Sequence, residues 1–260
     1  MATVAAKPRT LLLAVAIIAT CVLDIATCFA ADRFDGAIDR QHRSATDASR
    51  DALDHPAELL RLTGIGLGMR VADMLAGDGY YSELLGNLVG PGGHVLMINN
   101  SSFDKWTTDD RQKRLADNRL PNVEYRVVDL DRMNLEAGSL DAIVLSKVYH
   151  DLYWVDTTGI WPSFDTSGVL DQLAQALKPG GIVLLVDHSA RTGHGSADAS
   201  SLHRIEEAFA RHDFEKRGLR VIAHSELLRR NDDPREQISY KEPMLGKTDR
   251  FVLVFRKNRH

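Results

Sequence analysis

Short apolar runs alternate with amphipathic or charged stretches over most of this chain. The predicted strands are continuous apolar runs, which is typical of a parallel sheet covered on both faces. They lie at residues 70–74, 94–98, 123–128, 142–145, 182–186, 219–223 and 251–255. Helical patterns occupy residues 55–62, 81–89, 109–118, 169–177 and 202–215. This order predicts an α/β fold: a doubly wound, mostly parallel seven-stranded sheet with helices on both faces. The last two strands flank a loop over 234–246, and we expect them to form an antiparallel edge hairpin.

The first thirty residues have a different pattern. Lys7 and Arg9 precede an apolar run over residues 11–23, and small residues follow up to Ala30. A basic start, a short apolar run and a small-x-Ala exit predict a secretory signal peptide cleaved after Ala30. Asp24 shortens the apolar run, which disfavours a stable membrane span, although an uncleaved anchor is the alternative. We therefore expect an exported, periplasmic protein with no membrane association after cleavage.

The predicted signal also contains both cysteines, Cys21 and Cys28. The mature chain would then have no disulfide, cysteine nucleophile or thiolate metal site. The expected organisation is a signal peptide over 1–30, a polar linker or N-terminal helix over 31–54, and one domain over 55–260.

Composition excludes few functions. The chain has 260 residues, of which 44% are hydrophobic and 26% are charged, which is enough for one sizeable core. The net charge of −4 lacks the basic bias of most nucleic-acid-binding domains, so no nucleic-acid partner is expected. Oligomeric state does not follow from the sequence.

A glycine-bearing turn follows the first predicted strand. Residues 71–75 are apolar except for Asp73, and Gly77 and Gly79 separate them from the helical pattern that begins near Tyr81. Glycine adopts positive φ easily and leaves room for a ligand close to the backbone. A strand, a glycine turn and a helix in this order are typical of a nucleotide-like ligand site at the mouth of a parallel sheet.

Several further motifs have the spacing of a known family. Residues 55–257 resemble the class I S-adenosylmethionine-dependent methyltransferase fold. The matching pieces are Asp73 with Gly77 and Gly79, Val128-Asp129-Leu130, residues 138–144 and Leu177-Lys178-Pro179-Gly180-Gly181. More narrowly, the chain resembles a bacterial group of predicted exported methyltransferases. That resemblance rests on His203-Arg204-Ile205, Asp233-Pro234-Arg235 and residues 246–251.

The resemblance implies S-adenosylmethionine as the cofactor. The residues implied to bind it are Asp73, Gly77, Gly79, Asn99 and Asp129. Two positions depart from the family pattern: Leu75 replaces the first glycine of the turn, and Asn99 and Asn100 stand where an acid usually grips the ribose hydroxyls. Loss of that charge would weaken cofactor binding by about 1 kcal/mol.

Two clusters could carry chemistry. Tyr149 and His150 follow the fourth strand, where ligands of open α/β sheets bind, and we expect both to be catalytic, with His150 as a general base. The alternative is that this segment packs a helix against the sheet. Residues 187–195 follow the fifth strand, and Asp187 there could orient the imidazole of His188, or the loop could only bond its own backbone. His203 and Arg204 could complete the same pocket.

Other chemistries find less support. The histidines considered as metal ligands have no tight spacing, so no metal is predicted; they are His150, His188, His194 and His203. The chain has no Gly-x-Ser-x-Gly nucleophile elbow.

The sequence therefore predicts S-adenosylmethionine-dependent methyl transfer to a small-molecule acceptor. The first alternative is an exported binding or structural protein on a degenerate methyltransferase fold without catalysis. The second is a small hydrolase or metal-assisted enzyme that uses His150 and His188.

Overall fold

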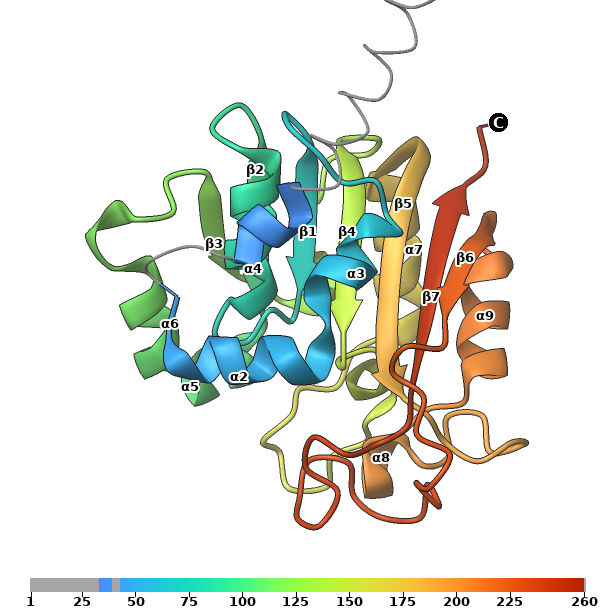
Figure 1. Ribbon diagram of the computed structural model, residues 1–260. Helices are drawn as coiled ribbons and strands as arrows, with labels where there is room; N and C mark the ends of the chain where they lie inside the picture. The colour runs from blue at the N-terminus through green and yellow to red at the C-terminus, as the bar shows by residue number, and fades with distance from the viewer. Residues whose placement is uncertain (1–32, 39–42, 260) are drawn as a thin grey trace, which may run out of the picture.

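The computed structural model describes residues 33–38 and 43–259, and Figure 1 shows one twisted sheet between two layers of helices. The predicted signal peptide lies outside the described residues. The strands run in the order β3-β2-β1-β4-β5-β7-β6. Their bounds are β1 Arg70–Met74, β2 His94–Asn99, β3 Val123–Val127, β4 Leu140–Ser146, β5 Leu177–His188, β6 Leu219–Ser225 and β7 Arg250–Lys257. The strands β1 to β5 pair in parallel, and β7 is antiparallel to both β5 and β6. The predicted fold class and the antiparallel edge are confirmed.

The helices bury one apolar core on each face of the sheet. Leu59 of α3 and Leu84 of α4 belong to the core on one face, and Leu173 of α7 and Phe214 of α9 to the core on the other. Because both faces are covered, the strands are apolar throughout. The helices are α2 Ala45–Asp54, α3 Pro56–Arg61, α4 Tyr80–Val89, α5 Ser101–Trp106, α6 Thr108–Leu115, α7 Thr166–Ala176, α8 Ala199–Leu202 and α9 Glu207–Glu215, with 3-10 turns η1 Ala116–Asn118, η2 Leu130–Arg132 and η3 His150–Tyr153. Within the described ranges, no helix is long and apolar enough to cross a membrane.

The helix predicted over 202–215 is broken, and this corrects the sequence interpretation. The helix α8 ends at Leu202, and α9 begins at Glu207. Between them His203 adopts the left-handed conformation, with φ 51°, and Ile205 forms a parallel bridge with Ser189 at the end of β5. The interruption points the Arg204 side chain into the interior, where it is fully buried.

The start of β5 also differs from the prediction. Residues 178–181 were expected to form a turn, but the strand assignment continues through them from Leu177. Gly180 has φ 82°, and the β4–β5 register shifts between Leu140 and Ala142, so this stretch is an irregular entry into the strand.

The segment predicted as a polar linker or N-terminal helix forms helix α2, whose N-terminus is well capped. The Ser44 hydroxyl accepts the N–H of Asp47, and the Asp47 side chain accepts the N–H of Ser44, which is a capping box. Asp47 also pairs with Arg114 at 2.9 Å, which fastens α2 to α6. As Figure 1 shows, α2 crosses below the carboxyl ends of the central strands.

Candidate active site

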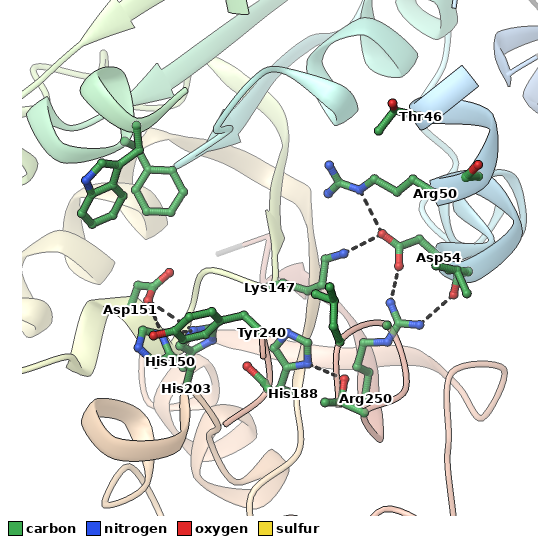
Figure 2. Close-up of a pocket in the computed structure, with 18 of the residues that line it drawn as sticks. Thr46, Arg50, Asp54, Lys147, His150, Asp151, His188, His203, Tyr240 and Arg250 are labelled. Atoms are coloured by element: carbon green, nitrogen blue, oxygen red, sulfur yellow. Dashed lines mark hydrogen bonds and ion pairs between the residues drawn. The ribbon is translucent and has the colours of Figure 1, made fainter. Parts of the chain in front are cut away.

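A cavity of about 870 Å³ opens at the carboxyl ends of β4 and β5, and Figure 2 shows its lining. Helix α2, helix α5, the segment after β4 and the loop between β6 and β7 all contribute side chains. They include Arg50, Asp54, Phe103, Lys147, His150 and Tyr240. This is the edge where open α/β sheets bind ligands, and a volume of roughly 300–1,000 Å³ is usual for a small-molecule site.

A buried ion pair lies behind the cavity lining and fixes the β6–β7 loop. Arg204 Nη1 lies 2.8 Å from Asp233 Oδ2, and both side chains are fully buried. Asp233 also accepts the backbone N–H groups of Arg235 at 2.8 Å and Asp249 at 2.6 Å. The three short motifs that resemble exported methyltransferases therefore form one structural unit. That unit holds the β6–β7 loop against the cavity, where Thr248 is part of the lining.

At one end of the cavity three cations share one carboxylate; we call this the cation-rich end. Asp54 accepts hydrogen bonds from Lys147 Nζ at 2.6 Å, from Arg50 Nε at 3.1 Å and from Arg250 Nη1. Burial alone would raise the pKa of Asp54, but Lys147, Arg250 and Arg50 hold it well below its usual range. Burial and the charge of Arg50 lower the pKa of Lys147 to about 8. The sequence interpretation missed this group because nothing in the sequence placed residues 31–54 beside the segment that follows β4.

At the opposite end two histidines meet two carboxylates; we call His150, Asp151, Asp187 and His203 the histidine cluster, of which Figure 2 labels His150, Asp151 and His203. His150 Nδ1 lies 2.7 Å from Asp187 Oδ1. On the other side of the ring, His150 Nε2 lies 3.2 Å from Asp151 Oδ1 and 3.3 Å from His203 Nδ1. His203 Nδ1 is in turn 3.4 Å from Asp151 Oδ1.

The charge state of His150 does not suit the predicted general base. Burial alone would lower the pKa of this imidazole, but Asp151 and Asp187 raise it to about 10. A histidine with that pKa already carries its proton at neutral pH, so it has no free nitrogen to accept another.

His188 is the neutral imidazole of the cavity. Burial and the positive charges of His150 and Lys147 lower its pKa well below the ordinary value. Its Nδ1 lies 2.7 Å from Thr248 Oγ1, and both residues line the cavity. Of the two histidines that follow β4 and β5, His188 is the one whose charge state allows it to accept a proton.

The turn after β1 keeps the left-handed path expected of a glycine turn. Gly77 has φ 62° and Gly79 has φ 88°, and Leu75 has φ 49° although it carries a side chain. That conformation costs a non-glycine residue roughly 1–2 kcal/mol. Burial of the Leu75 side chain in the core offsets this cost.

Asp73 lies directly before the turn and is 2% exposed. Its carboxylate accepts the hydroxyl of Ser82 at 2.7 Å, and burial raises its pKa to about 7. Gly77 lies beneath Phe103, because a Cβ on Gly77 would lie 3.9 Å from that ring. Arg50 reaches the turn from the cavity, with Nη1 3.8 Å from Asp78 Oδ1. The turn and the cavity therefore adjoin.

Asn99 holds the turn in place. Its Oδ1 accepts the N–H of Gly77 at 2.9 Å, and its Nδ2 donates to the carbonyl of Gly77 at 2.8 Å. The side chain is fully buried with both polar ends engaged. Contact of Asn99 with a cofactor stays a prediction, and its observed contacts are with the backbone of the turn.

Two other predicted site residues lie apart from the cavity lining. Tyr149 is fully buried and donates its hydroxyl to Asp213 of α9 at 2.7 Å. It therefore has the packing role that the sequence left open as the alternative, because its side chain points into the core. Asp129 is exposed and accepts the N–H of Asp131 at the start of η2. Its contact with adenine stays a prediction.

Comparison with known proteins identifies the class of domain. Residues 72–185 match the family described as Methyltransferase domain. The Ubiquinone/menaquinone biosynthesis C-methyltransferases UbiE of Pseudomonas savastanoi pv. phaseolicola and Pseudomonas syringae pv. syringae are 27% identical over 135 residues, 51% of this chain. The match covers 47% of each relative, so the chain spans about half the length of the curated proteins it matches.

Solved structures agree on the fold. A SAM-dependent methyltransferase from Aquifex aeolicus superposes with a TM-score of 0.58 at 20% identity, covering 80% of this chain and 92% of that one. An arsenic(III) S-adenosylmethionine methyltransferase from Chlamydomonas reinhardtii superposes with a TM-score of 0.51 at 17% identity, covering 80% and 72%. The fold is that of the class I S-adenosylmethionine-dependent methyltransferases. Residues 72–185 match a methyltransferase domain, and the solved structures of similar fold include methyltransferases that depend on S-adenosylmethionine.

The residues present fit that cofactor. The left-handed turn at Gly77 and Gly79 leaves the backbone open to a ligand. Next to it, Asn100 accepts the N–H of Phe103 through Oδ1, whereas its buried Nδ2 has no hydrogen-bond partner among the described residues. An unpaired buried donor at the end of β2 lies where the family binds ribose hydroxyls, and it is costly unless a ligand accepts its hydrogen bond.

Proposed function

We propose that this chain transfers the methyl group of S-adenosylmethionine to a small-molecule acceptor bound in the cavity. The observation that carries the proposal is the contact between the turn and the cavity, made through Phe103 and Arg50. A cofactor held at Gly77 and Gly79 would lie beside the space open to an acceptor. The cofactor, when bound, supplies a methyl group on a sulfonium, which a nucleophile displaces directly.

The protein then has two tasks. It aligns the acceptor, which brings most of the rate enhancement in a direct displacement, and it accepts a proton where the nucleophile carries one. The aromatic side chains Phe103, Trp106 and Trp154 line the cavity and would bury an acceptor's apolar part. His188 is neutral and is our candidate for the proton acceptor.

Isothermal titration of the purified full chain with S-adenosylmethionine and S-adenosylhomocysteine tests the proposal. We expect saturable binding of both. Asp73→Ala should weaken it about 10-fold or more, because a buried hydrogen-bonding carboxylate is lost next to the turn. Asp110→Ala is the matched control, since Asp110 is exposed on α6 and pairs only with Lys113 in the described structure. Absence of heat with either ligand at millimolar concentration would contradict the proposal and favour the binding-protein alternative.

We also propose that the chain is exported and cleaved after Ala30. The proposal rests on the basic residues Lys7 and Arg9, the apolar run over 11–23 and the small residues before Ala31. Expression in a bacterium with two membranes, followed by fractionation and N-terminal sequencing, tests it. The expected product is periplasmic and begins at Ala31. An intact N-terminus in the cytoplasmic fraction would overturn it.

A further inference from the structure

We propose that His150, Asp151 and His203 bind a zinc ion through His150 Nε2, Asp151 Oδ1 and His203 Nδ1. Each residue offers one ligand atom, and the three atoms lie within 4.8 Å of one another. The proposal stands on this geometry and does not depend on methyl transfer. His203 comes from the break between α8 and α9, 53 positions along the chain from His150.

Two of the three separations between the ligand atoms fall within the range of a tetrahedral zinc site, and the third is slightly shorter. The three separations are 3.2 Å, 3.3 Å and 3.4 Å. With zinc bonds of about 2.0–2.2 Å, neighbouring ligands of a tetrahedron lie about 3.3–3.6 Å apart. Neighbouring ligands of an octahedron with the same bonds lie about 2.8–3.1 Å apart, which is closer than all three observed separations. Two imidazoles and one carboxylate are also a donor set that zinc accepts.

The surroundings orient His150 as they do in known metal sites. Asp187 Oδ1 lies 2.7 Å from His150 Nδ1, and Asp187 Oδ2 accepts the backbone N–H of His150 at 2.8 Å. Metal-bound histidines usually donate their second N–H to a carboxylate, which fixes the tautomer and turns the other nitrogen toward the ion. Asp187 is therefore a positioning residue that leaves Nε2 facing Asp151 and His203.

The orientation of His203 is also fixed by its surroundings. Its backbone is left-handed, and its ring packs edge-on against Trp154 and Tyr240, with centroids 5.0 Å and 4.7 Å away. A strained backbone persists only where the surroundings determine it, and such positions gather at functional sites. The arrangement turns Nδ1 toward Asp151 rather than toward solvent.

Charge also favours a cation at this point. Asp151 and Asp187 are buried carboxylates on either side of one imidazole ring. Zinc would displace the second proton that His150 carries at neutral pH, which leaves the two carboxylate charges of Asp151 and Asp187 in a place with little water. A divalent ion between Asp151 and the two imidazoles would neutralise them.

The fourth position of the site opens into the cavity, because His150, Asp151 and His203 all belong to its lining. Zinc sites with three protein ligands and one open position bind water or a substrate there. A cavity ligand with an anionic oxygen or a thiolate would complete the coordination. The zinc site would therefore select a ligand by its coordinating group.

Zinc binding by the full chain tests the site. The purified chain is stripped with a chelator, dialysed against micromolar zinc sulfate and analysed for zinc by mass spectrometry of the element. We expect about one zinc ion per chain. Asp151→Asn keeps the shape but loses the charged ligand, and His203→Asn keeps a residue that tolerates left-handed φ but loses the ring nitrogen. Both should lose the zinc, and Asp187→Asn should bind it about 10–100-fold more weakly.

His194→Asn is the matched control, because His194 pairs with Asp198 at 3.0 Å outside the cluster. It should bind as much zinc as the natural chain. Thermal unfolding of each variant confirms that it is folded. A natural chain that binds no zinc would overturn the proposal, and so would Asp151→Asn and His203→Asn variants that bind as much zinc as the natural chain.

Discussion

The two ends of the cavity have opposite excesses of charge. At the cation-rich end three cations surround one carboxylate, that of Asp54. In the histidine cluster two carboxylates flank the ring of His150. The first end can attract an anionic group of a ligand, whereas the second can attract a cation. A small molecule whose anionic group binds at the cation-rich end would therefore be held in one orientation, and orientation is what a direct methyl transfer requires.

The largest loss of stability should come from removing the Asp54 carboxylate, which the three cations of the cation-rich end share. Asp54→Ala leaves the buried Arg250 and the partly buried Lys147 without their shared carboxylate, and should lower the free energy of unfolding by about 3–5 kcal/mol. Urea denaturation of the full chain measures this change. Asp110→Ala, at an exposed ion pair, should change stability by less than about 0.5 kcal/mol. Equal losses of stability in the two variants would show that the ion pairs of Asp54 contribute no more to the free energy of unfolding than an exposed ion pair does.

Asp73 is buried like Asp54, but it has no cation partner in the described part of the chain. Among the described residues no cation lies within ion-pair distance of Asp73, and burial raises its pKa to about 7 from an ordinary value of 3.8. Between these values the folded chain holds a proton that the unfolded chain has released. Stability contributed by protonated Asp73 is therefore complete below about pH 4 and is lost as pH rises through about 7.

The variant Asp73→Asn has no such titration and keeps an oxygen that can accept the Ser82 hydroxyl. Its stability relative to the natural chain should rise by up to about 4 kcal/mol between pH 4 and pH 8. Urea denaturation across this pH range measures the difference. A constant difference between the two proteins would show that burial does not disfavour the Asp73 charge.

A smaller loss of stability is expected at the histidine cluster. Asp187→Asn retains one oxygen for the backbone N–H of His150 but loses the charge beside the imidazole. We expect a loss of about 1–3 kcal/mol, less than for Asp54→Ala, because no buried cation with a permanent charge is left unpaired. Thermal and urea unfolding check this order. A larger loss of stability for Asp187→Asn than for Asp54→Ala would show that the histidine cluster contributes more to stability than the cation-rich end, contrary to our expectation.

The fold was predictable because its signals are local. Apolar runs marked all seven strands, and Gly77 and Gly79 marked the turn. The break at His203 was not predictable, since the helical pattern continues through it. What interrupts the helix is tertiary structure: Arg204 pairs with Asp233, and Ile205 pairs with Ser189.

The site was predictable only in part, because contacts between segments that are distant in the sequence leave no local pattern. The sequence singled out His150 and His188, which both line the cavity. Nothing local indicated that α2 brings Asp54 to Lys147, 93 positions away, or that His203 meets His150. Tyr149 belongs to the same short segment as His150 but points into the core, because successive residues of a tight turn point in different directions.

We propose that the glycine turn and the cavity form one site for the cofactor and the acceptor. Hydrogen–deuterium exchange of the full chain, with and without S-adenosylmethionine, tests it most directly. We expect slower exchange with the cofactor at residues 75–79 and in α2, where Arg50 reaches the turn. Exchange in the distant strand β6 should be unchanged. Unchanged exchange at the turn under saturating cofactor, or protection only away from the cavity, would contradict it.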